Sequence, residues 1–387
     1  DRNGLRPLRY TVTRDKLLFA GSETGMIDLN EKKIVSKGRL GPGEILGVRI
    51  EKGKVYSNDE IKNYLSKEYK HYNNQIIDLD KKLEAETEKV ELEGQSLRNF
   101  QHCFGYSIED LELILHPMAE DAKEATGSMG DDTPLAVLSD KYRPLYHYFR
   151  QNFSQVTNPP IDSLRENKVM SLKTRFGNLG NILDFSKLTK DNIYVLNSPI
   201  LSNAQFEKFL KFFGNNNKVL DCTFSKDDDL ETSINLLKVK SEQAVREGIK
   251  QIILSDKNIS ENRMPMPMLL CIGAINTHLV KLGLRGYVSI NVQTGDALDT
   301  HSFATLIGVG ATTVNPYLAF DSLYQRHSKK LFGNFTFDEC VSRYIKSVNL
   351  GLLKIMSKMG ISVLSSYRGG CNFETVGLSR TIVKDYF

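Results

Sequence analysis

The chain has 387 residues, of which 40% are hydrophobic and 25% charged, and this composition suits a globular protein of two or three domains. Its 51 basic and 47 acidic residues leave a net charge of only +4, and the two signs are interspersed, which argues against a nucleic-acid partner. No apolar run approaches the length of a membrane span, and no signal peptide opens the sequence, so we expect no membrane partner.

The five cysteines are widely spaced, and no two of them have the spacing of a metal-binding pair. The seven histidines show no ligand spacing with them. We therefore expect reduced thiols, no disulfide framework and no metal site. The sequence opens at Asp1 without a methionine and stops at Phe387 directly after an apolar run, so we expect a segment of a longer chain.

Residues 1–75 predict a β-rich segment with two hairpins, one turning at Arg14-Asp15 and the other at 51–53. Few large apolar side chains are present, so we expect this segment to complete a sheet that begins upstream. Residues 76–96 are dense in Glu and Lys, and they predict a solvated helix or a linker.

Two loops stand out in the next hundred residues. The first, residues 127–132, is glycine-flanked and polar, and taken alone it is typical of a surface turn. In the second, Pro159 and Pro160 fix two φ angles, and Pro159 disfavours the helical conformation at Asn158. Thr157 and Asn158 are therefore expected to be extended. Taken alone, this second loop is typical of a rigid corner between domains.

From residue 191 the pattern changes to short runs of Val, Ile and Leu that alternate with helical segments. Such runs are typical of parallel strands buried on both faces. Five strands are predicted, at residues 192–197, 217–224, 249–256, 286–293 and 311–316. The predicted fold class is therefore α/β, with an incomplete (β/α)8-like domain as the main interpretation and a doubly wound open sheet as the alternative.

Candidate chemistry within these strand–helix units is sparse. Asp256 and Gln293 come at the carboxyl ends of predicted strands, where barrel enzymes place functional groups, but ordinary polar loop residues also occur there. His278 lies in a mostly apolar helix, which favours a structural histidine. Gly308 and Gly310 lack the third glycine of a dinucleotide-binding fingerprint.

The last fifty residues predict an amphipathic helix over 349–359 that ends at Gly360, followed by a buried strand over 361–367. Arg368 and the two glycines after it predict a flexible cationic turn. Such a turn can hold an anion, although a surface arginine in a turn is the commoner case.

Five stretches of the sequence resemble the large subunit of glutamate synthases: DRNGLRP (1–7), TGSMGDDTPLAVLSD (126–140), SQVTNPPIDSLRE (154–166), SPILSN (198–203) and RYIKSVNLGLLKIMSKMGISVLSSYRGGCNFETVGLS (343–379). The resemblance implies the C-terminal part of a class II, N-terminal-nucleophile glutamine amidotransferase domain at 1–75, a linker at 76–96 and a central domain at 97–330. Residues 331–387 would begin the FMN-binding synthase domain and supply the first elements of an FMN-type barrel.

By this resemblance, the parent enzyme would convert glutamine and 2-oxoglutarate into two glutamates, and so serve glutamate biosynthesis and ammonia assimilation. It would use FMN, an iron–sulfur cluster and electrons from an NADPH-oxidising small subunit or from ferredoxin. Met129, Thr157 and Asn158 would line a passage for ammonia. The expected compartment is the cytoplasm, or the plastid in a photosynthetic eukaryote.

The resemblance also implies what this chain lacks. It has no N-terminal nucleophilic cysteine and no complete FMN site, so we expect no catalytic residue and no bound cofactor in it. The family usually has Ala-Gln-Ile after Arg-Gly, whereas Gly370, Cys371 and Asn372 stand here, and Cys371 is not expected to be a cluster ligand. Two alternatives remain open: a non-catalytic spacer between two active sites, and a free-standing α/β-barrel ligand-binding module.

Overall fold

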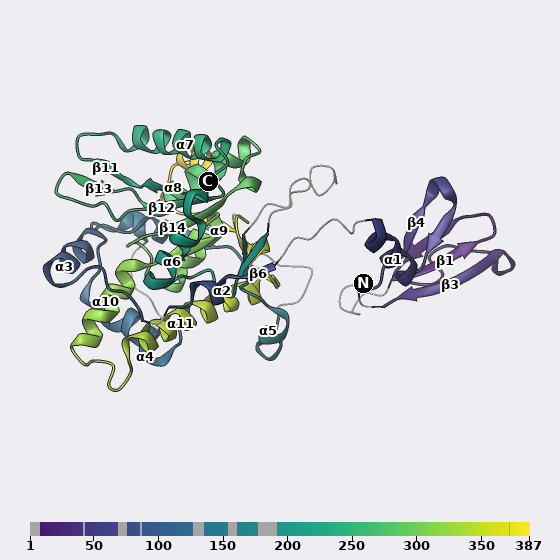
Figure 1. Ribbon diagram of the computed structural model, residues 1–387, viewed down its shortest axis with the longest axis horizontal. Helices are drawn as coiled ribbons and strands as arrows, with labels where there is room; N and C mark the ends of the chain where they lie inside the picture. The colour runs from purple at the N-terminus through teal and green to yellow at the C-terminus, as the bar shows by residue number, and fades with distance from the viewer. Residues whose placement is uncertain are drawn as a thin grey trace. The chain divides into compact units, whose positions relative to one another are not determined.

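The chain divides into two compact units, Asp1–Asn73 and Asn74–Phe387, which are described one at a time. The computed structural model describes residues 8–41, 43–68, 76–85, 87–126, 135–153, 161–176, 192–370 and 372–387 (Figure 1). Within these ranges no helix is long and apolar enough to cross a membrane.

The first unit consists of antiparallel strands and one helix. Its elements are β1 (Leu8–Thr13), β2 (Leu18–Gly21), β3 (Ile34–Leu40), β4 (Gly47–Arg49), β5 (Lys54–Tyr56) and α1 (Asn58–Glu68). The strands form one sheet of order β2-β1-β3 and a separate β4-β5 hairpin. Both predicted hairpins are confirmed: β1 turns into β2 around Arg14-Asp15, and Gly53 takes a left-handed φ of 59° between β4 and β5.

Helix α1 was missed by the β-rich prediction for residues 1–75. Its start is marked by a reciprocal cap, in which Ser57 Oγ accepts from the Glu60 N–H at 3.4 Å and Glu60 Oε2 accepts from the Ser57 N–H at 2.9 Å. A serine followed three residues later by a glutamate is the sequence signature of such a cap. The signal was therefore present in the sequence.

The second unit is built on a parallel sheet. Its strands are β10 (Asn217–Asp221), β12 (Gln251–Ser255), β14 (Ser289–Gln293) and β15 (Thr313–Asn315), in that order across the sheet. Every residue of β12 is buried, and so are all of β14 except the first, as expected for strands covered on both faces. Ile200 adds one parallel bridge to Val314. The predicted α/β class is confirmed.

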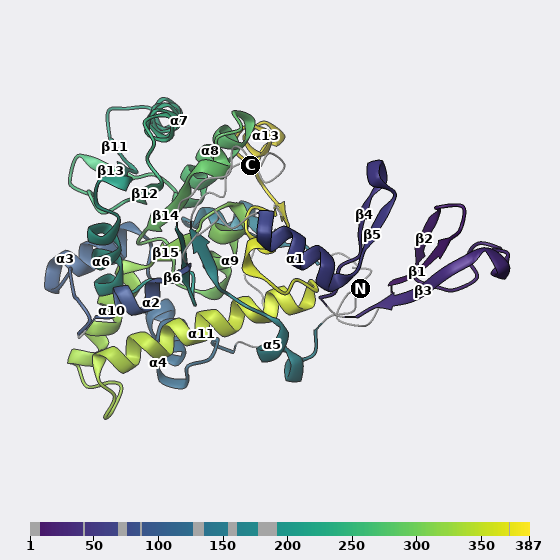
Figure 2. The same ribbon diagram turned by 45° about the vertical axis from the view of Figure 1, so that its right-hand side comes forward.

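Helices surround this sheet, and α11 is the longest of those described. The larger helices are α3 (Gly94–Cys103), α6 (Asn203–Phe213), α7 (Leu230–Arg246), α8 (Met268–Lys281), α9 (Thr300–Val309), α10 (Tyr317–Ser328) and α11 (Phe337–Lys358). The shorter ones are α2 (Leu79–Leu83), α4 (His116–Asp121), α5 (Ser163–Val169), α12 (Leu364–Tyr367) and α13 (Arg380–Tyr386), with a π-helical turn at Asp110–Leu115 before α4. Helix α11 contacts α4, α9 and α10 and lies along one side of the unit (Figure 2).

Three small sheets complete the second unit. They are β11 (Thr223–Ser225) with β13 (Arg263–Pro265), β7 (Phe149–Gln151) with β16 (Phe373–Thr375), and the order β6 (Ile76–Asp78), β9 (Ile193–Leu196), β8 (Thr174–Phe176). The predicted strand at 192–197 is thus confirmed as β9. It lies outside the main sheet because β6 and β8 occupy both of its edges.

Two local predictions were wrong. Residues 76–96 are not a solvated linker throughout, since Leu79 and Leu83 of α2 are fully buried in a cluster with Phe206 and Phe209. Residues 361–367 do not form a strand. Val363 makes a single bridge to Ser171, and helix α12 begins directly after it, burying Leu364 and Tyr367 at a helical spacing of three.

Candidate functional site along helix α11

Helix α11 is positioned by its sequence pattern. Thr336 Oγ1 accepts from the Glu339 N–H at 3.2 Å, and Glu339 Oε2 accepts from the Thr336 N–H at 2.7 Å, which closes a capping box at the start. Buried residues recur every three or four positions along one face, among them Tyr344, Val348 and Leu352. Gly360, with φ +65°, follows the helix, as predicted.

Described residues from two of the stretches named in the sequence bond to the second half of this helix, and a residue from a third lines a cavity beside it. Ser198 Oγ donates to Asn349 Oδ1 at 2.9 Å, and the Ile161 N–H donates to the Ser357 carbonyl at 3.2 Å. Residues 123–126 line a surface cavity of about 440 Å³ with Leu350, Gly351 and Lys354. The structure therefore places Thr126, Ile161 and Ser198, one described residue from each of three stretches, at or beside one helix, although the sequence separates them widely.

The three residues predicted to line an ammonia passage, Met129, Thr157 and Asn158, lie outside the described residues. Their predicted role therefore stays a prediction. The nearest described neighbours are Thr126, in the wall of the cavity beside α11, and Ile161, bonded to α11 as above.

Gly351 sets how closely α11 and α9 approach. A Cβ atom at this position would lie 2.4 Å from Thr300 Cγ2 and 2.6 Å from Thr300 Oγ1, so only glycine fits without displacing Thr300. The Thr300 hydroxyl is itself buried and has no hydrogen-bond partner in the described part of the chain. This contact is a helix–helix packing contact, and it holds α11 against the strand–helix units.

The carboxyl end of the parallel sheet is filled with polar side chains that bond to one another. Asp256 follows β12 and is fully buried. It accepts from the Thr294 hydroxyl, from the Gly295 N–H at 3.1 Å and from the Tyr317 hydroxyl at 2.9 Å. Burial raises the pKa of Asp256 to about 7, and these three hydrogen bonds oppose the rise. Burial also raises the pKa of Asp296 to about 6.

A chain of amide side chains continues across this end of the sheet. Gln293 accepts from the Ser255 hydroxyl at 2.9 Å and donates to Asn315 Oδ1 at 3.3 Å. Asn315 donates to Asn203 Oδ1 at 3.0 Å, and Asn203 donates to Asp321 Oδ1 at 3.2 Å. The network ends on the Asp321 carboxylate, which also accepts from the backbone N–H groups of residues 91 and 92.

Asp256 and Gln293, the two sequence candidates for chemistry, therefore serve this network. Their hydrogen-bonding groups are directed at neighbouring side chains and backbone. His278 lies 3.0 Å from Glu242 Oε2, and His301 donates from Nε2 to the Tyr146 carbonyl at 3.0 Å, so both histidines have structural partners. Sequence analysis missed the part of Asp321 in this network, because nothing local to it signals a partner some 118 residues away.

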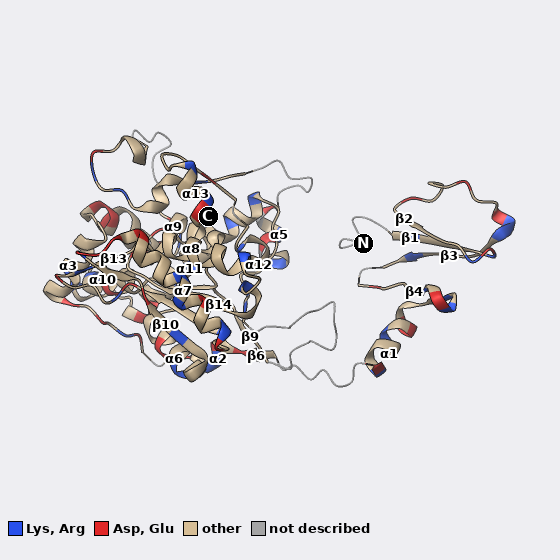
Figure 3. Ribbon diagram, turned by 90° about the horizontal axis from the view of Figure 1, so that it is seen from above, with Lys and Arg blue, Asp and Glu red and all other residues tan. Residues whose placement is uncertain are grey.

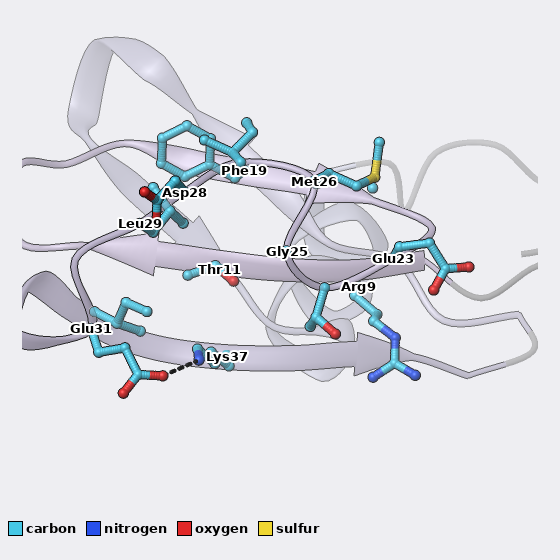
Figure 4. Close-up of a pocket in the computed structure, with 15 residues that line it drawn as sticks. Arg9, Thr11, Phe19, Glu23, Gly25, Met26, Asp28, Leu29, Glu31 and Lys37 are labelled. Carbon is cyan, nitrogen blue, oxygen red and sulfur yellow. Dashed lines mark ion pairs between the residues drawn. The ribbon is translucent and has the colours of Figure 1, made fainter.

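The first unit has a cavity of its own, of about 640 Å³, lined by β1, β2, β3 and the loop between β2 and β3 (Figure 4). Met26 and Ile27 of that loop are 65% and 51% exposed. Lys37 Nζ lies 3.7 Å from Glu31 Oε1 in the wall of the cavity. Arg9 Nε is buried and has no partner among the described residues. Two neighbouring apolar side chains of this loop are therefore more than half exposed.

These features define a class of protein: an α/β domain with a parallel four-stranded sheet, preceded in the chain by a separate β-rich unit. Residues 99–379 match the family model described as Glutamate synthase central domain, and the chain belongs to this family. Residues 1–74 match the model described as Glutamine amidotransferases class-II.

Curated relatives extend beyond this chain. It is 50% identical over 395 residues to the glutamate synthase (NADPH) large chain of Azospirillum brasilense, covering 100% of this chain and 26% of that protein. It is 40% identical over 392 residues to the corresponding protein of Bacillus subtilis, covering 100% and 25%. The chloroplastic ferredoxin-dependent glutamate synthase of Spinacia oleracea is 39% identical over 406 residues, covering 99% and 25%. The chain thus spans about a quarter of the length of these relatives.

The family match also bears on the predicted boundaries. The central-domain model extends to residue 379 and so includes most of 331–387, where the sequence predicted the start of the synthase domain. Helix α11 and the segments after it lie in the same compact unit as the parallel sheet. The boundary at 330 stays a prediction.

Proposed function

We propose that this chain is the central part of a glutamate synthase, which makes two glutamates from glutamine and 2-oxoglutarate with electrons from NADPH or ferredoxin. Residues 1–75 would complete the amidotransferase domain, with the exposed Met26 and Ile27 packing against its remainder. FMN and an iron–sulfur cluster would be held by parts of the enzyme outside this chain. The second unit would connect the two active sites.

The proposed contribution of this unit is geometric. Ammonia released into water at neutral pH is mostly protonated, and ammonium is not a nucleophile. A walled route keeps ammonia neutral until it reaches the 2-oxo carbon, where bound flavin supplies the hydride. In this proposal, residues 126–140, 154–166 and 198–203 form part of that wall, with Met129, Thr157 and Asn158 facing the route.

The observation that carries the proposal is the convergence on α11. Three separated stretches reach Asn349, Leu350 to Lys354, and Ser357, which lie within about two and a half helical turns of one another. A shared wall needs such convergence, because a passage built from distant segments must be held by a common element.

The competing proposal is a spacer that only separates two active sites. The carboxyl end of the sheet favours it, since the polar groups there bond to one another. A free-standing ligand-binding module would instead use that end of the sheet as its pocket, and the same packing argues against it.

The test uses the full-length enzyme, with glutamine-driven and ammonia-driven glutamate formation measured separately. Thr157→Ala and Met129→Ala are expected to lower the glutamine-driven rate several-fold while the ammonia-driven rate survives. Ser198→Ala, which removes the bond to Asn349, is expected to act in the same direction but less strongly. Ser365→Ala, an exposed serine on α12, is the matched control. Equal effects on both rates, or no effect on either, would favour the spacer.

A further inference from the structure

A second cavity of the larger unit lies at the amino end of the parallel sheet, opposite the polar network. Its volume is about 560 Å³, and its lining includes Gln251 and Ser289, which begin β12 and β14, and Thr312, which precedes β15. Small-molecule sites commonly occupy about 300–1,000 Å³. The cavity is therefore large enough for a small metabolite.

Four basic side chains line this cavity, and they come from separate segments. Arg175 belongs to β8, Lys250 precedes β12, Arg285 lies between α8 and β14, and Arg368 follows α12. No Asp or Glu occurs among the described residues that line it. This concentration differs from the rest of the unit, where Figure 3 shows basic and acidic residues intermixed.

Arg285 is held rigidly. Its Nε donates to Asn276 Oδ1 at 2.7 Å, and its two terminal nitrogens donate to the carbonyls of Val288 at 2.6 Å and Gly310 at 2.8 Å. A guanidinium has five N–H groups, so two remain for a ligand. All three of these partners are neutral oxygens, so no negative side chain among the described residues that bond to Arg285 cancels its charge.

The charges of Arg285 and Arg368 act on each other. Burial and the charge of Arg368 lower the pKa of Arg285 to about 10, and burial lowers the pKa of Arg368. A carboxylate beside either guanidinium would raise its pKa, and none does so in the described part of the chain. Two partly buried cations held together in this way are costly unless an anion joins them.

The negative partial charges at the carboxyl ends of the nearby helices offset only part of the positive charge of the arginines. Residues near the carboxyl ends of α6, α7, α8 and α9 contribute to the cavity wall or lie next to it. Each helix end carries about half a negative charge, which sums to about −2. Against the three arginines alone this leaves an excess of about +1.

We propose that the cavity at the amino end of the sheet binds a small anion whose charge is carried on oxygens, either phosphate or a dicarboxylate. Arg368 and Arg175 contact the oxygens, and Arg285 supplies a fixed positive charge behind them. Arginine suits both ligands, because its planar fork matches the oxygens of phosphate and carboxylate groups. This site is independent of the ammonia passage proposed above.

Calorimetric titration of the 387-residue chain tests the proposal, with inorganic phosphate and succinate as separate probes and sodium chloride at matched ionic strength as the reference. We expect saturable binding of at least one probe, together with a rise in the unfolding temperature. Binding of phosphate alone identifies a phosphate ligand, and binding of succinate alone identifies a dicarboxylate.

Variants locate the bound anion. Arg368→Gln and Arg175→Gln are each expected to weaken binding about tenfold, which corresponds to the loss of one charge-assisted hydrogen bond. Arg98→Gln, an exposed arginine on α3 that bonds to Gln95, should leave it unchanged. The proposal is overturned if neither probe gives a saturable signal above chloride, or if Arg98→Gln weakens binding as much as the cavity variants do. Because Arg175 and Arg368 lie on different elements, misfolding of one variant leaves the other to decide.

Discussion

The two ends of the parallel sheet differ in how their polar groups are satisfied. At the carboxyl end, Asp256 and Asp321 are surrounded by hydroxyl, amide and backbone donors from their own chain. At the amino end, the partners of Arg285 among the described residues are all neutral oxygens, and Arg368 lies beside it. Parallel α/β folds usually bind ligands at the carboxyl end. In this unit that end is closed by its own side chains, whereas Arg285 and Arg368 at the other end have no acidic partner among the described residues.

This difference shows why a fold alone does not locate a site. The sheet is of a kind that hosts many enzymes, but its carboxyl end carries a network in which the members serve as each other's partners. A buried polar network with all partners present specifies one arrangement of the core. It leaves few groups for a substrate, which agrees with a domain that contributes geometry rather than a nucleophile.

The largest expected effect is at the carboxyl end. Replacing Asp256 by alanine leaves the Thr294 and Tyr317 hydroxyls and the Gly295 N–H without their acceptor in a buried place. We expect the free energy of unfolding of the 74–387 unit to fall by about 3 kcal/mol at pH 6, measured by urea denaturation. Asp227→Ala, in an exposed turn, should change it by less than about 0.5 kcal/mol. Similar losses for both variants would mean that the network contributes little.

The pH dependence of the same residue gives the next largest effect. The pKa of Asp256 in the folded chain is raised to about 7, above its ordinary value near 4. Asp256 therefore makes its full contribution to the free energy of unfolding below pH 4, and this contribution is lost as the pH rises through 7. From pH 5 to pH 8 the wild type should therefore lose about 2.5 kcal/mol relative to Asp256→Asn, which does not titrate. If the free energies of unfolding of the two proteins differ by the same amount at pH 5 and at pH 8, the buried carboxyl group is not neutral at pH 5.

A third variant tests the packing of α11, which belongs to neither end of the parallel sheet. Gly351→Ala should destabilise the unit by about 1 to 2 kcal/mol, since its methyl group meets Thr300. Thr300→Ala in the same chain should recover part of the loss, because the two sites are in contact. The matched control is Gly286→Ala, where a Cβ atom would meet nothing within 4 Å. Equal losses at the two glycines would show that the close approach of α9 and α11 does not limit stability.

The smallest expected effect is at the amino end. Arg368→Gln removes a charge that has no acidic neighbour among the described residues. We therefore expect the free energy of unfolding, measured in chloride buffer, to change by no more than about 0.5 kcal/mol in either direction. A loss comparable to that of Asp256→Ala would show that Arg368 is a structural partner, and it would remove the contrast between the two ends.

Sequence patterns were sufficient where burial is local and repetitive. The runs of Val, Ile and Leu located all four strands of the main sheet. The prediction of a strand over 361–367 was wrong because the apolar run there is typical of a strand, whereas Leu364 and Tyr367 are buried at a helical spacing. The position of β9 depended on β6 and β8, which no local pattern indicates.

The candidate sites were harder to predict, because they depend on contacts between distant residues. The sequence identified the stretches 126–140, 154–166 and 198–203, but not α11 as the element that they share. It likewise identified Arg368 as a cationic turn without its neighbours Arg285 and Arg175. Such convergence is a property of the tertiary fold, and residue patterns within one segment carry no information about it.

The carboxyl end of the sheet is filled by polar side chains of the chain itself, so we expect no flavin to bind there. Titration of FMN into the purified 387-residue chain, followed by flavin absorbance and fluorescence, tests it directly. We expect spectra that stay those of free FMN up to about millimolar concentrations of the chain, the range in which a weak site would show. A saturable spectral shift in the micromolar range would contradict it, and would establish a flavin site within these residues.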